Sequence, residues 1–490
     1  MYRSSVSAYG GSSTEPDYVY YNADIINNRT DDATFALTPS PDPPIRFNET
    51  RDAPLIKNAD DYHFSIIRFT MNGANRDLPL FIPNIQTGQT NVNLTTYAST
   101  ISYQATWTTN LGNITFNVSP AATALIYQPE TINAVLAPTP AAPTVKQDLS
   151  TRYYWVYTYQ HMVDLVNQTF INAHQALYTA FQAAWAGTAG LTDPFPFATF
   201  AAFQDSIQSP RLVYLGESSQ LFQIYGDSAG FGQPLEPFVA IPYAPGTAVL
   251  TSRPQYRLFF NTNLYGLFAN FQNLYWNSTT ITSYTVPGQT PAYTLPAFPA
   301  PVPVGYTNEI LFPNKNFQNV ADYRIAPYAG VPPLGYVPTS QQKVWWVAQQ
   351  DYKSVDSLWS PISSIVFTST LLPLKTEATG QPILLGTSNT GDSTAAVQNA
   401  FLPIITDIAL DQALGGADDY RQFLYYAPAA EYRMADFGTS KQEIRNIDIQ
   451  VFWKNRLDNN LYPVTMFNLS SVSIKVMFRR RDYIGKTSEY

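Results

Sequence analysis

The sequence predicts an all-β protein, a single jelly-roll β-sandwich with a large mixed insertion that contains a helix. Three observations lead to this fold class. Apolar residues alternate with period two near both ends of the chain, a central segment has the 3.6-residue period of a helix, and proline-rich stretches separate these parts. Strand-rich ends that cannot each bury a complete core are expected to combine into one sandwich.

The first strand-rich part is assigned to residues 44–135, after an N-terminal arm of residues 1–43. In DYHFSIIRFT, Tyr62, Phe64 and Ile66 fall on one face of a predicted strand. The stretches NVNLTTYAST and NITFNVS continue with β-branched residues, which favour strands. All three stretches are therefore predicted to belong to the jelly roll.

Residues 136–335 are assigned to an insertion domain. The stretch LAPTPAAPTV marks its start, and residues 286–306 are too proline-rich for interior strands. Within it a helix is predicted near residues 158–186, ending near Gly187, because apolar residues recur at steps of three and four. This stripe, interpreted as a packing face, consists of Met162, Val166, Phe170, Ala173, Leu177, Phe181 and Ala184. The change of period predicts that the block projects from the sandwich.

The second strand-rich part is assigned to residues 336–483, followed by a C-terminal tail of residues 484–490. Two alternating runs near its end, separated by the turn residues KNRLDNNLYP, are predicted to be strands of an antiparallel sheet. Their core-facing residues are Ile447, Ile449, Val451 and Trp453, then Val472, Ile474, Val476 and Phe478. Further strands are predicted in KVWWVAQ, SSIVFTSTLL, IITDIAL, QFLYYAP and EYRMADF. Residues 376–396 are interpreted as a long exposed loop.

The stretch GDSAG at 226–230 fits the G-x-S-x-G pattern that mounts a nucleophilic serine between a strand and a helix. A catalytic Ser228 would need a histidine base, which follows the serine in α/β-hydrolases, but His63, His161 and His174 all precede it. A His, Asp, Ser chain order stays formally open, yet His63 and His161 lie in strand-like and helix-like stretches. The motif is interpreted as a turn between strands, and the protein is predicted not to be an enzyme.

No cofactor and no metal site are predicted. The chain has no cysteine, which excludes disulfides and cysteine-ligated zinc. His161 and His174, the nearest pair of histidines, are thirteen residues apart on the predicted helix, so they do not lie within one turn of each other.

The composition favours a protein whose surface is covered by neighbours. Charged residues make up only 13% of the chain and aromatic residues 14%. The cores of protein interfaces likewise contain fewer charged and more aromatic residues than the rest of the surface. The net charge of -8 gives no reason to expect sequence-specific nucleic-acid binding. The one basic run, Arg479, Arg480 and Arg481, follows the last predicted strand and is the candidate subunit interface. Alternatively, the run is simply solvated, or it faces RNA or DNA in the interior of a particle.

The N-terminal stretch MYRSSVSAYGGSSTEPDY has no apolar core of the kind that a signal peptide needs, and no run of about 18 apolar residues occurs. The protein is therefore expected to be made in the cytoplasm without membrane insertion.

Three stretches resemble the penton, or minor capsid, proteins of virophages and Polinton-like viruses. They begin PIRFNETRDAPLIKNADDYHFSIIRF, LWSPISSIVFTSTLLPLK and QFLYYAPAAEYRMADFGTSKQEIRNIDIQVFW, and together span a third to half of the chain. The resemblance implies a single jelly roll that forms homopentamers at icosahedral vertices beside a major capsid protein. It also implies an insertion that projects outward and serves attachment to a host receptor, no catalytic residues, and a location in the virion.

Three other readings stay open. Two fused jelly rolls would make the chain a major capsid protein, with the second roll starting near residues 253–268. A receptor-binding or carbohydrate-binding β protein would use tryptophan and tyrosine on loops to stack on sugars. A hydrolase built on Ser228 is the weakest reading. The number of copies per ring distinguishes a penton protein from a major capsid protein.

Overall fold

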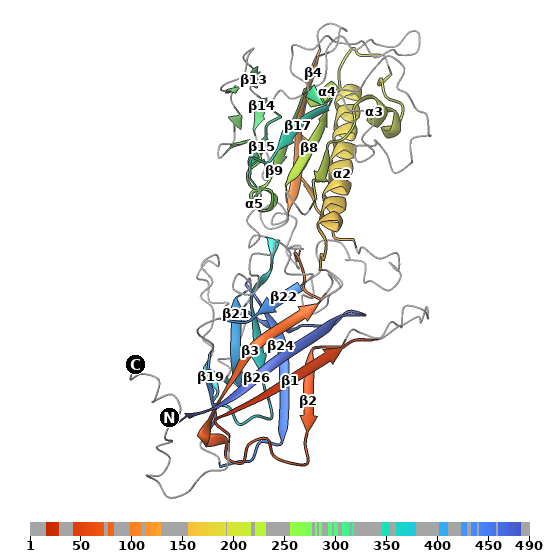
Figure 1. Cartoon of the computed structure of the whole chain (residues 1–490). Coiled ribbons are helices and arrows are strands. Elements are labelled where there is room, and N and C mark those ends of the chain that lie inside the picture. The colour runs from red at the N-terminus through yellow and green to blue at the C-terminus, as the bar shows by residue number, and fades with distance from the viewer. Residues whose placement is uncertain are drawn as a thin grey trace, which may run out of the picture. The chain divides into compact units, whose positions relative to one another are not determined.

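In the computed structural model, the chain forms two compact units (Figure 1). Unit 1 comprises residues 1–80 and 360–490, and unit 2 comprises residues 81–359. The structure describes residues 16–28, 43–72, 77–82, 99–108, 114–128, 155–192, 194–216, 221–231, 255–276, 280–281, 284–286, 293–295, 298–301, 306–312, 316–317, 345–352, 359–378, 401–409, 423–428, 433–438, 441–456 and 459–481.

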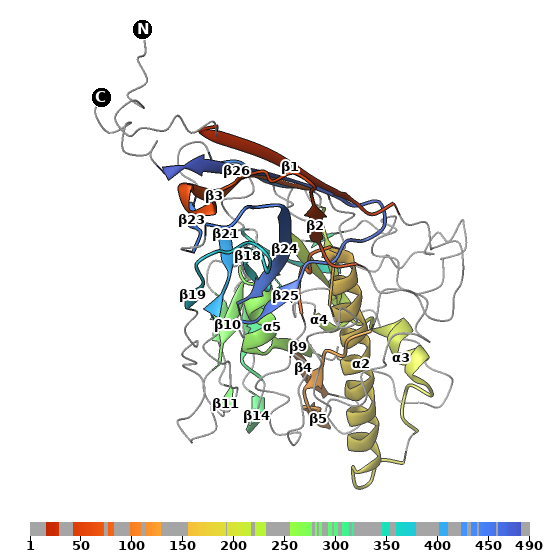
Figure 2. The ribbon, with the colours of Figure 1, turned by 90° about the horizontal axis from the view of Figure 1, so that it is seen from below.

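Unit 1 consists mainly of two antiparallel sheets. The first has the order β1 (Tyr18–Ile26), β26 (Ser471–Arg480), β3 (Tyr62–Asn72) and β22 (Phe423–Tyr426), with β23 (Ala435–Asp436) also paired to β3. The second has the order β2 (Arg46–Thr50), β24 (Asn446–Asn455), β18 (Ile362–Thr368) and β21 (Ile404–Ala409), with β25 (Leu461–Pro463) paired to β24. Figure 2 shows β1, β26 and β3 as neighbouring strands of one layer.

The strand pairs of unit 1 are nested, as in a long hairpin that has been rolled up. The first strand pairs with the last (β1 with β26), and the second pairs with the second-last long strand (β2 with β24). The third, β3, pairs with β22 and β23, and β18 pairs with β21 at the centre. Four main strands in each of two sheets, with this nesting, form a jelly roll; the short strands β23 and β25 are additions at β3 and β24. The predicted fold class is therefore confirmed.

A β-bulge in β3 explains why its core-facing residues change from even-numbered to odd-numbered positions along the strand. The register pairs Val476 with Ile66 but Lys475 with Arg68, so β3 holds one extra residue. Tyr62, Phe64 and Ile66 face the core before the bulge, as predicted, and Phe69 and Met71 face it afterwards. Phe69 then meets Phe367 of the other sheet edge to face at 4.9 Å between ring centroids.

The two final long strands face one core from opposite sheets. Trp453 is fully buried together with its predicted neighbours on β24, and the predicted inward residues of β26 are buried as well. The expectation that the two runs pair in one antiparallel sheet is wrong. β24 pairs instead with the short β25 of the intervening segment, and the chain then crosses to the other sheet.

Asp448 is a buried carboxylate on β24 that fixes the turn after β18. It accepts hydrogen bonds from the amides of Thr370 and Leu371, both at 2.8 Å, and from the hydroxyls of Ser369 and Thr370. Burial by itself would raise the pKa of Asp448, but these four donors outweigh it and hold the pKa below its ordinary value.

Unit 2 contains two further sheets and four helices in its described part. The first of these sheets has the order β10 (Asn273–Tyr275), β15 (Asn308–Ile310), β9 (Gln255–Phe260), β4 (Thr100–Thr108) and β5 (Thr115–Val118), and β6 (Thr123–Ala124) also pairs with β4. The second has the order β16 (Asn316–Phe317), β17 (Trp345–Gln349), β8 (Phe222–Asp227) and β7 (Arg211–Tyr214). Two strand pairs complete it, β11 (Thr280–Ile281) with β14 (Phe298–Pro301) and β12 (Tyr284–Val286) with β13 (Tyr293–Leu295). The helices are α2 (Tyr159–Ala186), α3 (Phe200–Ser206), α4 (Ser228–Phe231) and α5 (Thr262–Leu267).

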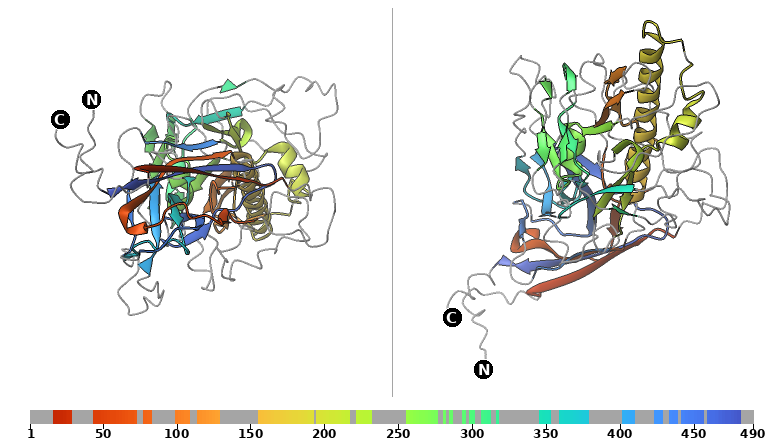
Figure 3. Two further views of the ribbon diagram at one scale, coloured as in Figure 1. Left: turned by 60° about the horizontal axis from the view of Figure 1, so that its bottom comes forward. Right: turned by 90° about the horizontal axis from the view of Figure 1, so that it is seen from above.

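The predicted central helix is confirmed as α2, the long yellow helix of Figure 3. It begins after Thr158, whose hydroxyl accepts a hydrogen bond from the His161 amide at 3.1 Å, and it ends before Gly187. The predicted stripe is buried up to Phe181, but the last turn buries Trp185 rather than Ala184. The stripe packs on β4, where Phe181 meets Trp107 edge to face at 5.7 Å. No helix in the described part of the chain is long and apolar enough to span a membrane.

A buried ion pair joins the neighbouring strands β9 and β15 of unit 2. The guanidinium of Arg257 donates from Nε to Oε1 of Glu309 at 2.7 Å and from Nη2 to Oε2 at 2.5 Å. Both side chains are almost fully buried, at 4% and 2% exposure. The indole Nε1 of Trp276 donates to the same carboxylate at 2.8 Å, and its ring also lies against the guanidinium.

The predicted boundaries of the insertion are wrong at both ends. Strands β4, β5 and β6, assigned to the jelly roll as part of residues 44–135, belong to unit 2, where β4 pairs with β9. Strand β17, assigned to residues 336–483, pairs with β8 in unit 2. Alternation identifies a strand but not its partner, so it could not locate the boundary.

The predicted arm and the predicted loop both contain strands, and two other predicted segments lie outside the described residues. Strand β1 lies within the predicted arm 1–43 yet forms an edge of the jelly roll. In the loop predicted at 376–396, β19 (Glu377–Ala378) pairs with β20 (Phe401–Leu402). The predicted tail 484–490 and the proline-rich stretch 136–145 lie outside the described residues.

A second jelly roll is not formed by the described strands of unit 2. In chain order, β8 lies between the paired strands β4 and β9, but its own partner β17 lies after β9. These two pairs therefore overlap in the sequence, whereas the pairs of a jelly roll are nested one inside the other. The segment at 253–268, which would begin a second roll, forms β9 and the short helix α5.

Candidate functional site

The segment around Ser228 runs directly from strand β8 into the four-residue helix α4. The expectation of a turn between strands is therefore wrong. Both glycines of the motif have a packing explanation: a Cβ at Gly226 would lie 3.0 Å from the Phe231 ring, and one at Gly230 would lie 2.7 Å from the Tyr256 ring. The side chain of Ser228 lies outside the described residues.

Each histidine has a structural partner. His63 lies on β3 of unit 1, whereas Ser228 belongs to unit 2. His161 and His174 lie on α2, where Nε2 of His161 is 2.6 Å from the Gln128 carbonyl and Nε2 of His174 is 2.9 Å from the Ile207 carbonyl. In the parts of the chain that the structure describes, no three metal-ligating side chains are close enough to hold an ion.

His174 makes unit 2 sensitive to acid. Burial lowers its pKa to about 4, although the hydrogen bond to Ile207 opposes this. An unfolded histidine takes up its proton near pH 6.5, so the contribution of neutral His174 to stability is complete above that pH and is lost as the pH falls toward 4. We expect unit 2 to lose about 2 kcal/mol between pH 7 and pH 5 from this group. Thermal unfolding of His174→Gln should show a smaller loss over this range, with His161→Gln as the control; an unchanged pH slope in His174→Gln would contradict the assignment.

The three candidate arginines lie in different environments. Arg479 and Arg480 are the last two residues of β26, so the expectation that the run lies just beyond the sheet is wrong for both. Arg479 pairs in register with Tyr18 on one side and His63 on the other. Arg481 follows the strand, and its guanidinium approaches groups of the same chain.

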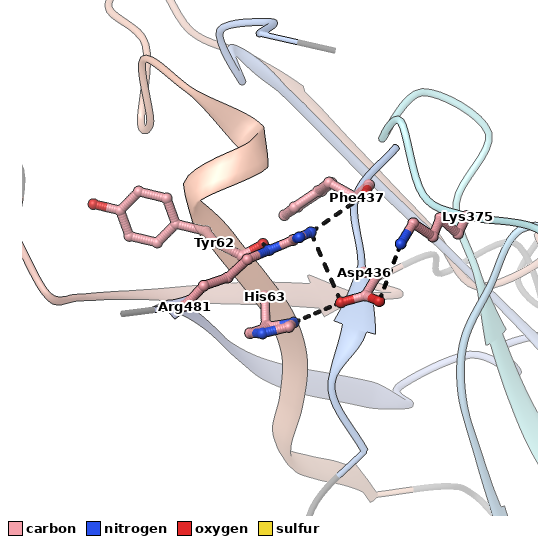
Figure 4. A network of polar contacts seen from close by, with 6 residues as sticks. All are labelled: Tyr62, His63, Lys375, Asp436, Phe437 and Arg481. Carbon is pink, nitrogen blue, oxygen red and sulfur yellow. Dashed lines mark hydrogen bonds and ion pairs between the residues drawn. The ribbon is translucent and has the colours of Figure 1, made fainter. Parts of the chain in front are cut away.

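Asp436 is the centre of the polar network around Arg481, shown in Figure 4. Its Oδ1 lies 2.7 Å from Nδ1 of His63 and 3.8 Å from Nη2 of Arg481, and its Oδ2 lies 3.4 Å from Nζ of Lys375. Arg481 also donates weak hydrogen bonds to the carbonyls of Phe437 and Tyr62, at 3.4 and 3.5 Å. The network ties the end of β26 to β23 and β3.

The network favours ionised Asp436 and neutral His63. Burial by itself would raise the pKa of Asp436, but the hydrogen bond from Lys375 and the charges of His63, Lys375 and Arg481 outweigh it and lower the pKa. Burial lowers the pKa of His63, the charges of Arg481 and Arg479 lower it further, and Asp436 only partly opposes them. Arg481 is therefore already engaged within its own chain.

The outer face of the first sheet carries two cations beside Arg479 that the sequence analysis did not single out. Lys475 of β26 is directly opposite Arg68 of β3. Lys475 stands between the core-facing residues Ile474 and Val476, and Arg68 stands between the bulge and the core-facing Phe69. The ammonium of Lys475 lies 5.3 Å from the ring centroid of Tyr20, and the guanidinium of Arg479 lies 5.9 Å from that of Tyr18. We call Arg68, Lys475 and Arg479 the cationic face.

The chain matches the family model described as Sputnik minor capsid protein V18/19 over residues 19–480. It is also similar to a chain in the cryo-EM structure of the Sputnik virophage, with 17% identity, 97% of this chain and 100% of that chain covered, and a TM-score of 0.56. The crystal structure of the mavirus penton protein matches with 12% identity, 95% and 100% coverage, and a TM-score of 0.48. A comparison with curated proteins finds no match. The family match spans both units of the chain, and the Sputnik structure shows that the fold is shared.

Proposed function

The chain belongs to the Sputnik minor capsid protein V18/19 family, and on this basis we propose that it is the penton subunit, which assembles as a homopentamer at the icosahedral vertices. Family membership makes it a structural component of the virion capsid and not an enzyme. The observation that carries the proposal is a family match that runs from the first strand of the jelly roll to the last. The major capsid protein of the same virus is the proposed neighbour around each pentamer.

The copy number of the assembled protein tests this role. Purified full-length protein examined by native mass spectrometry and negative-stain imaging should show closed rings of five, because a vertex has fivefold symmetry and cyclic contacts close into rings. A monomer at all concentrations would contradict the penton role, and a trimer would favour the major capsid alternative.

We further infer that unit 2 serves attachment to the host, and that the chain is made in the host cytoplasm. Unit 2 is a compact unit with its own buried core, inserted between two strands of the jelly roll, so its sequence can vary without altering the strand pairs of unit 1. Full-length protein should compete with virions for adsorption to host cells, whereas a variant lacking residues 81–359 should not. Equal competition by both proteins would contradict this role, and specific binding on a glycan array would identify a carbohydrate receptor.

A further inference from the structure

The cationic face places like charges opposite each other. Lys475 and Arg68 are direct cross-strand partners. Directly opposed like charges destabilise an antiparallel pair. A jelly roll selected only for its own stability would place an acidic or neutral residue at one of these positions.

Neither Arg68 nor Lys475 has a carboxylate partner in the described part of the chain. The ammonium of Lys475 lies against the ring of Tyr20, and the Nε of Arg68 is buried without a hydrogen-bond acceptor among the described residues. This contrasts with Arg481, whose guanidinium approaches Asp436 and two carbonyls. A buried guanidinium nitrogen without an acceptor carries a desolvation cost that a further acceptor would remove.

We propose that a second copy of this chain supplies the missing carboxylates, so that the cationic face is one half of the contact between neighbouring subunits in the ring. The inference rests on the proposed pentamer. A ring of identical chains is built from heterologous contacts, in which one surface meets a different surface of the next copy. The chain carries 36 acidic against 28 basic residues, so a second copy as a whole has the charge opposite to that of the cationic face.

The tyrosines beside the cations suit such a contact. Tyr20 is 56% exposed on edge strand β1, and its ring and that of Tyr18 are parallel, with centroids 6.3 Å apart. Tyrosine and arginine are enriched in interfaces, because each joins a broad apolar surface to a polar end. Duplex DNA is the less favoured occupant, since its affinity comes from many phosphate contacts and the chain as a whole is anionic.

Neutralising the two opposed cations tests the inference. The double variant Arg68→Gln and Lys475→Gln should melt at the same temperature as the wild type or a higher one, because a repulsion is removed, while ring formation weakens by about tenfold at low salt. The difference should shrink at high salt, where charges are screened. The matched control, Arg46→Gln with Lys454→Gln, removes the same charge from β2 and β24 and should leave assembly unchanged.

Several results would overturn the inference. They are rings as stable as those of the wild type, an equal loss in the control, or a loss that is independent of salt. Retained rings with lost binding of a duplex DNA probe would assign the face to nucleic acid instead. A wild-type protein that forms no rings would instead contradict the proposed penton function. Failure of the penton function and failure of the interface inference therefore give different results.

Discussion

Replacing Trp453 by alanine is expected to lower the free energy of unfolding of unit 1 by about 3 to 5 kcal/mol. The side chain is fully buried on β24, opposite Ile365 of β18, and its ring stacks on Tyr462 of β25 at 4.8 Å between centroids. Its removal leaves a cavity where three strands meet, and close-packed cores collapse only partly around such a void. Since domains are stable by only about 5 to 15 kcal/mol, unit 1 should melt far earlier or fail to fold.

The neighbouring Phe452 provides the matched control for this variant. It lies on the same strand but is only partly buried, on the opposite face. Phe452→Ala should therefore cost much less than Trp453→Ala in denaturant unfolding followed by circular dichroism. Similar losses for the two variants would show that position on the strand, rather than burial in the sandwich, determines the effect.

Replacing Glu309 by leucine is expected to destabilise unit 2 by about 3 to 5 kcal/mol, because it leaves the Arg257 guanidinium buried without its counter-charge. The Trp276 indole also loses its acceptor. The transition assigned to unit 2 should shift to lower temperature in calorimetry, while that of unit 1 stays in place, because the pair lies between two strands of unit 2.

The double variant Arg257→Met with Glu309→Leu separates charge from packing. Two apolar side chains of similar volume remove both charges together, and such replacements are often neutral or stabilising. The double variant should therefore recover most of the stability that the single variant loses. If both are equally destabilised, the loss comes from altered packing and the ion pair itself is of little importance.

Much of the jelly roll could be predicted from the sequence, because alternation reports directly on burial. The inward residues of β24 and β26 and the long helix α2 were identified in this way. Strand partners were not, since period two says which face is buried but not which strand lies alongside. This is why β4 and β17 were assigned to the sandwich although they pair within unit 2.

The candidate interface was only partly accessible from the sequence. A run of three arginines is conspicuous, yet the structure engages Arg481 internally and places Arg479 beside Lys475. Arg68 is hundreds of residues away in the chain, and the bulge in β3 decides which face it occupies. The signal that could have found both residues is a cation at a polar position within a strongly alternating strand.

The nested pairing also determines when the protein can fold during synthesis. Strand β1 near the N-terminus pairs with β26 near the C-terminus, so the first sheet cannot close until almost the whole chain has left the ribosome. Unit 2 is complete in sequence by residue 359 and can form earlier. During that interval β1, β2 and β3 expose unpaired edges to other nascent chains, and translation speed and chaperone access over this window should therefore govern how many copies reach assembly.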